Sequence, residues 1–208
     1  MELNVSFYLK DLKIILINII VILNILTLGL GNITEYKSEI NLVIQGKGNH
    51  YFLSELFILE PSVVIVNGVR NDSCKKNYTF ENDLNNVTII FDRLINTCEN
   101  MFKRLKNLIE IDLSNLDTSK VTNMFDQCIN LEKINFGNIN TSLVIDMQYL
   151  FHNCSKLASI DVSKFDTSSV TNFRYLFSEC RSLTSIDVTN FNTQNVVDMQ
   201  DFLQLVIV

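Results

Sequence analysis

Apolar and polar residues follow one another in the same order four times along the second half of the chain. Each copy opens with apolar residues at every second position, continues with a polar Asp-Thr or Asn-Thr pair, and then returns to apolar residues. The leucines that open the copies are spaced by 23, 26 and 26 residues: Leu108, Leu131, Leu157 and Leu183. A half-copy at 98–107 precedes them, and the fourth copy is incomplete. Such a fixed period predicts coils that stack on one another.

The pattern inside each copy predicts the content of a coil. Apolar side chains at every second position indicate a strand with one face in the core. The Asp-Thr or Asn-Thr pair is typical of a turn. Phe125, Phe151 and Phe177 each precede a cysteine by three residues, which favours one face of a short helix. We therefore expect an α/β repeat solenoid over 98–208, with coils of strand, turn and short helix.

The repeated framework also carries a family resemblance. L-x-x-I-x-L-x-x-L, then D-T-S-x-V-T-N-M and M-F-x-x-C-x-x-L, resembles the BspA-type leucine-rich repeat, also described as the 26-residue repeat of surface proteins. The resemblance covers 98–208. It implies leucine-rich-repeat coils on a cell surface, used for adhesion or recognition without catalysis or a cofactor. The family has no reactive motif, so no site residue is carried over.

Two regions precede the repeats. After Lys10 and Lys13, seventeen residues from Ile14 to Leu30 carry no charge. A cleaved signal peptide within 1–31, an uncleaved signal anchor and a buried core helix all fit this segment. Region 32–97 has three strand-like runs and an Asn-Gly hairpin signal at 67–68, which predicts a small β-rich cap on the first coil. We expect an extracellular or cell-surface protein of the secretory pathway, with a membrane contact only through an uncleaved N-terminal segment.

The polar residues between the apolar ones of each strand are the candidate binding face. These residues face away from the core, and equivalent ones lie above one another because the coils stack. Stacked acids repel, so this ladder suggests a bound cation or a basic partner; a solvated face on which Asp prevents edge pairing is the alternative. The candidate residues are Asp112, Ser114, Asn135, Asp161, Ser163, Asp187 and Thr189.

Cysteines and glycosylation signals fit an exported protein. In an oxidising compartment we expect a disulfide between Cys74 and Cys98, with two free buried thiols as the alternative. The cysteines of the repeats share one column and are expected to be small buried side chains, not zinc ligands. Asn-x-Ser/Thr signals make four residues candidate N-glycosylation sites: Asn71, Asn77, Asn86 and Asn140.

The composition of the chain argues against two classes of function, nucleic-acid binding and catalysis. A net charge of −6 and a pI near 4.9 argue against nucleic-acid binding. The only histidines are His50 and His152, and side chains two apart, as in His152 and Cys154, point in different directions on a helical turn, so we do not expect an enzyme. The expected function is recognition of a protein or glycan partner. A self-associating surface coat and an inactive fragment of a larger surface protein remain as alternatives, the latter because the apolar ending "QLVIV" lacks a polar capping repeat.

Overall fold

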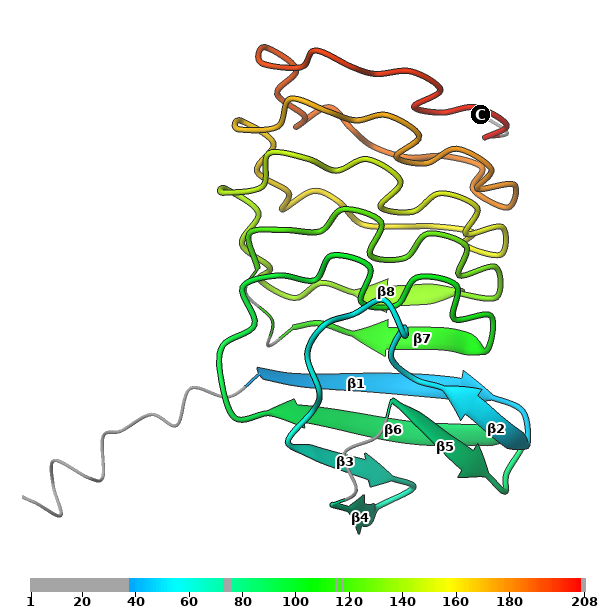
Figure 1. Cartoon of the computed structure of the whole chain (residues 1–208). Coiled ribbons are helices and arrows are strands. Elements are labelled where there is room, and N and C mark those ends of the chain that lie inside the picture. Colours follow the sequence, from blue (N-terminus) through cyan, green and yellow to red (C-terminus); the bar gives the residue numbers. More distant parts are fainter. Residues whose placement is uncertain (1–37, 73–75, 115, 117, 207–208) are drawn as a thin grey trace, which may run out of the picture. The chain divides into compact units, whose positions relative to one another are not determined.

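A computed structural model describes residues 38–72, 76–114, 116 and 118–206 (Figure 1). The chain divides into two units, Met1–Tyr36 and Lys37–Val208, and the described residues all belong to the second. The expected signal peptide or anchor within 1–31 lies outside the described residues. In the described part of the chain, no helix is long and apolar enough to cross a membrane.

Strands from the expected cap and from the first two coils form one sheet. Its order is β4-β3-β6-β1-β7-β8, and all neighbours are antiparallel except the parallel pair β7 and β8. β2 and β5 form a separate two-stranded sheet. The strands are β1 (Ser38–Gln45), β2 (Gly48–Tyr51), β3 (Val63–Val66), β4 (Val69–Asn71), β5 (Asn77–Phe80), β6 (Leu84–Phe91), β7 (Leu108–Asp112) and β8 (Lys133–Asn135).

Strand alternation gives the larger sheet one buried face and one open face. In β1, Ile40, Leu42 and Ile44 are buried, whereas Asn41 is exposed. Antiparallel pairing of β1 with both β6 and β7 joins the cap to the first coil without a break. The Asn67-Gly68 signal connects β3 to β4, and both residues have positive φ, as a type I′ hairpin turn requires.

The repeated segments stack as coils, as Figure 1 shows from green to red. Each phenylalanine amide bonds to the next coil: Phe125 N donates to Leu150 O and Phe151 N donates to Leu176 O, both at 3.0 Å. Rings of one column lie face to face, with 5.8 Å between the centroids of Phe125 and Phe151 and 5.4 Å between those of Phe151 and Phe177. The expectation that equivalent residues meet in successive coils is therefore confirmed.

The predicted short helices do not form, and the α/β fold class is wrong. The described residues contain strands and turns without a helix. Asn123 and Gln127 have φ of 55° and 64°, a left-handed conformation that interrupts an α-helix. Four-residue turns replace it, for example the turn closed by the bond from Cys128 N to Phe125 O at 3.0 Å, while alternate amides bond to the next coil. The described part is all-β.

Regular strands form in the first two coils but not in the later ones. The close approach of β8 to β7 depends on Gly137, because a Cβ at that position would lie 2.5 Å from Cα of Ser114. In the later coils the equivalent residues are Ser163 and Thr189, and no ladder joins the strands there. These coils are linked elsewhere, by single bridges from Asn172 to Asp146 and to Asp198. The predicted strand in every copy is thus correct for two copies only.

Candidate functional site

The predicted binding face is a column of turn-forming side chains. In each coil, a backbone N–H donates to Oδ1 of the Asp or Asn two residues earlier. The four bonds run from Ser114 to Asp112 at 2.8 Å, Gly137 to Asn135 at 3.0 Å, Ser163 to Asp161 at 2.9 Å and Thr189 to Asp187 at 2.9 Å. The pKa values of the Asp161 and Asp187 carboxyls are lowered, chiefly by hydrogen bonds from Ser163 and Thr189. The Asp and Asn side chains of this ladder are therefore engaged in hydrogen bonds within their own coils.

Two further columns repeat the same turn. One contains the Asp or Asn that precedes the threonine, as in the bond from Ser168 N to Asp166 Oδ1 at 3.0 Å. The other lies before the phenylalanine, as in the bond from Gln200 N to Asp198 Oδ1 at 2.8 Å. Across the described ranges, no group of three or more His, Cys, Asp or Glu side chains is arranged to hold a metal ion.

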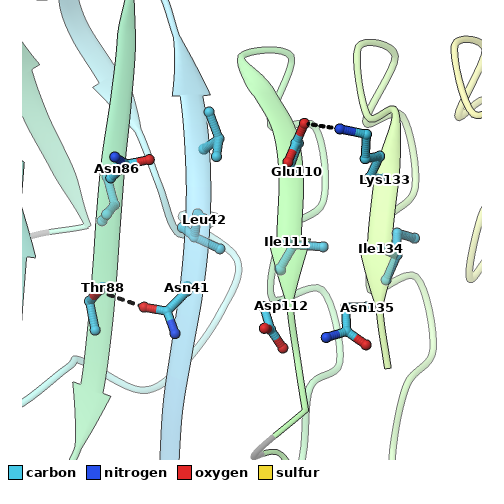
Figure 2. A pocket seen from close by; sticks show the side chains of 12 residues that line it. Asn41, Leu42, Asn86, Thr88, Glu110, Ile111, Asp112, Lys133, Ile134 and Asn135 are labelled. Carbon is cyan, nitrogen blue, oxygen red and sulfur yellow. Dashed lines mark hydrogen bonds and ion pairs between the residues drawn. The ribbon is translucent and has the colours of Figure 1, made fainter. Parts of the chain in front are cut away.

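A groove of about 490 Å³ lies on the open face of the larger sheet, where β6, β1, β7 and β8 run side by side (Figure 2). Alternation places polar side chains of all four strands along it. Of the predicted binding residues, Asp112 and Asn135 line the groove, and the other five do not. The remaining polar lining consists of Asn41, Asn86, Thr88, Glu110 and Lys133.

Hydrogen bonds within the groove hold several of these side chains in place. The Thr88 hydroxyl donates to Oδ1 of Asn41 at 2.6 Å, and Lys133 Nζ lies 2.6 Å from Glu110 Oε1 (Figure 2). This ion pair raises the pKa of Lys133. Asp112 has a lowered pKa because Ser114 and, to a smaller extent, Asn135 donate hydrogen bonds to it, while partial burial acts in the opposite direction.

The cysteine column is buried and engaged in hydrogen bonds. Cys128 Sγ donates to Phe102 O at 2.9 Å, Cys154 Sγ to Phe125 O at 3.2 Å and Cys180 Sγ to Phe151 O at 3.1 Å. Burial raises the pKa of each thiol, that of Cys180 to about 12. These are poor conditions for a nucleophilic thiolate.

Cys98 is a buried thiol whose pKa burial raises to about 12. Cys74 lies outside the described residues, so the disulfide between them stays a prediction.

A buried carboxylate links three successive coils, which the sequence did not suggest. Asp126 Oδ1 lies 2.7 Å from His152 Nδ1, and its Oδ2 lies 3.0 Å from Lys103 Nζ. Burial raises the pKa of Asp126, but the hydrogen bonds from His152 and Lys103 outweigh it and the net shift is downward. Because His152 contacts Asp126 and Cys154 contacts a carbonyl, the two do not form a pair.

The candidate glycosylation sites occupy different environments. Asn86 and Asn140 are exposed, whereas Asn71 and Asn77 are half-buried. Asn86 also lines the groove, so a glycan at this residue would compete with a ligand there. Modification of all four residues stays a prediction.

Comparison with known proteins identifies a family. Neither curated proteins nor solved structures give a match to the chain. The family described as "Mycoplasma protein of unknown function, DUF285" matches residues 74–128 and 96–206. These segments include the last cap strands, the half-copy and all four repeats, which together make up more than half of the 208 residues. The chain therefore belongs to the DUF285 family of Mycoplasma proteins of unknown function.

Proposed function

We propose that this chain is a non-enzymatic recognition protein of the BspA-like surface type, and that it binds a glycan in the groove across β6, β1, β7 and β8. The groove carries the proposal, because it is a concave site of ligand size with polar side chains from four strands. Export to the cell surface, glycosylation at residues outside the groove and the absence of catalysis belong to the same proposal.

The lining chemistry supports a polyhydroxylated ligand. Amide side chains offer a donor and an acceptor on one planar group, which suits neighbouring sugar hydroxyls. Asn86 is exposed, and the hydrogen bonds described for this residue use its backbone and leave the side-chain amide available. Glu110 and Lys133 offset one another, so Asp112 is the main net charge along the groove. A neutral hydroxyl-rich ligand fits this balance better than a strongly charged one.

The test is binding of the purified chain to a glycan array, followed by affinity measurements with the strongest glycan. Asn86→Trp adds bulk at the groove, and Thr79→Trp adds the same side chain to an exposed position of β5, in the other sheet. We expect Asn86→Trp to weaken binding by about tenfold or more, while Thr79→Trp binds like the wild type. Lack of any glycan ligand, or equal binding by both variants, contradicts the proposal.

Self-association is the second candidate, and exposed apolar side chains in the last coil favour it. Val197 is 88 % exposed and Leu205 is 55 % exposed. Sedimentation at increasing concentration distinguishes the two functions. A monomer at all concentrations supports recognition, and an assembly that Val197→Asp dissolves supports the coat protein.

A further inference from the structure

A second pocket, of about 320 Å³, lies where β2 and the segment after it meet the half-copy at 98–107. One wall comes from residues 49–51 and 54–56, and the other from 103–107. None of these residues lines the groove proposed for the glycan. The pocket is thus a separate site, independent of the proposed function.

The coil wall of this pocket is basic although the whole chain has a net charge of −6. Lys103, Arg104 and Lys106 line it within four residues of one another. Lys103 is paired with Asp126, whereas Arg104 and Lys106 are exposed and have no side-chain hydrogen bond or ion pair among the described residues. Two cationic groups are therefore available to a ligand.

The opposite wall adds polar groups and one carboxylate. The Tyr51 hydroxyl donates to Glu55, and this bond is the main cause of the raised pKa of Tyr51. Glu55 is the single acidic residue of the lining, against three basic ones. Since Asp126 offsets Lys103, a net positive charge remains in the pocket.

Local hydrogen bonds fix the shape of the basic wall. Arg104 has φ of 64°, its amide donates to Asp126 O at 2.8 Å, and the amide of Lys106 donates to Arg104 O at 2.9 Å. The Asn107 side-chain amide donates to Gln45 O at 2.7 Å and so fastens the end of this wall to β1. The backbone that carries the two available cations is held in place before a ligand binds.

Stacking does not explain the basic residues. The later coils have uncharged or acidic residues in the place of Arg104. These residues are Gln127, Asn153 and Glu179, and each of them also has a positive φ. The position of Lys106 is taken by Ile129 and Ser155 in the next two copies and by Arg181 in the last copy, where Arg181 is paired with Glu179. The later copies therefore stack without an unpaired cation at these two positions, and among the described copies only the half-copy at 98–107 carries two of them.

We infer that this pocket binds a phosphate monoester group through Arg104 and Lys106. A guanidinium matches two phosphate oxygens at once, and an ammonium adds a second charge-assisted hydrogen bond. The group is either carried by a small soluble molecule or exposed in a lipid headgroup, because both present the same dianion to the pocket. Recognition then depends on charge and on the two side chains, not on the rest of the ligand.

The experiment measures binding of the full chain to inorganic phosphate and glycerol phosphate by calorimetry, and to vesicles with or without phosphatidic acid by flotation. Arg104→Gln reproduces the residue found at 127, where φ is also 64°, and it is combined with Lys106→Gln. Lys156→Gln is the charge-matched control, since Lys156 is exposed and has no side-chain partner among the described residues.

We expect the double variant to bind about tenfold or more weakly than the wild type, and Lys156→Gln to bind normally. Phosphate binding without vesicle binding supports a soluble ligand, and phosphatidic-acid binding that free phosphate inhibits supports a headgroup. The inference is overturned if none of the probes binds, or if Lys156→Gln loses binding as much as the double variant. Asn86→Trp should keep phosphate binding, so failure of the groove proposal and failure of this one are distinguishable.

Discussion

The interior of the coils and the junction between cap and coils use side chains in opposite ways. In the coils, residues of one kind meet in columns and satisfy one another or the nearby backbone. The thiol of Cys154 bonds to a carbonyl of the preceding coil, and the carboxylate of Asp161 bonds to an amide two residues later. At the junction, strands distant in sequence meet, and polar groups such as the amide of Asn86 and the cations of Arg104 and Lys106 line two pockets.

This difference shows where ligand chemistry is available in a repeat protein of this kind. A column residue must suit its neighbours above and below, so its polar atoms are already engaged. A junction residue has no equivalent neighbour on one side, and its chemistry is not fixed by the repeat. Substitutions of column residues should therefore affect stability and not binding.

The largest effect is expected for Phe151→Ala. The ring of Phe151 is fully buried and stacked between those of Phe125 and Phe177. Its removal leaves a cavity in the column and should lower the free energy of unfolding by about 3–5 kcal/mol. Chemical denaturation measures this change. A loss below about 1 kcal/mol would mean that the column is not a packed core.

Asp126→Asn should have the next largest effect, and the effect should depend on pH. The variant loses the charged partner of Lys103 and His152, which should cost about 1.5–3 kcal/mol at pH 5. Because folding lowers the pKa of Asp126, its contribution is present above the unfolded pKa of about 3.9 and is lost as pH falls through the folded pKa.

Unfolding curves of the wild type and of Asp126→Asn, recorded from pH 5 to pH 2, should therefore converge at the acid end. A stability difference that stays constant over this range, or grows on acidification, would contradict the assigned role of Asp126.

A smaller loss is expected for Thr141→Val. The buried Thr141 hydroxyl accepts from Asp166 N at 2.8 Å and donates to Asp166 O at 3.0 Å, which joins two coils. Valine keeps the shape but leaves both backbone groups without this partner, at a cost of about 1–2 kcal/mol. Thermal unfolding of Thr141→Val is compared with that of Thr79→Val, an exposed strand position where we expect almost no change. Equal melting temperatures for the two variants would count against the buried bridge.

The smallest effect is expected for Asp161→Ala. The exposed Asp161 carboxylate accepts a hydrogen bond from Ser163 N that water can replace, so its loss should change the free energy of unfolding less than any of the substitutions above. The same denaturation assay measures it. If Asp161→Ala destabilised the chain as much as Phe151→Ala, the assignment of outward and inward columns would be wrong.

Much of the repeat architecture was predictable because it rests on apolar periodicity. The stacked columns of Leu, Phe and Cys and the Asn67-Gly68 turn follow from local patterns that the structure keeps. The absence of the short helices could not be predicted in this way. Residues in the left-handed conformation take their place, and these include Tyr149, a residue type that rarely adopts positive φ. The sequence pattern of Phe three residues before Cys is shared by a helix and by consecutive turns.

The candidate site was predictable only in part. Asp112 and Asn135 were recognised as outward residues, but the groove around them needs the pairing of β1 with β7, which joins residues far apart in sequence. The turn-forming role of the Asp ladder had a signal, since Ser, Thr or Gly follows each Asp or Asn by two residues. The basic pocket also had a signal in the sequence, which is the run of basic residues from Lys103 to Lys106.

The most direct test of the account compares the affinities of two variants for the glycan that the wild type binds most strongly on the array. Asn86→Trp changes the junction, and the double variant Asp161→Ala with Asp187→Ala changes the exposed column away from the groove. The account predicts a loss of about tenfold or more for Asn86→Trp and wild-type affinity for the column variant. Loss of binding in the column variant, with normal binding in Asn86→Trp, would contradict it.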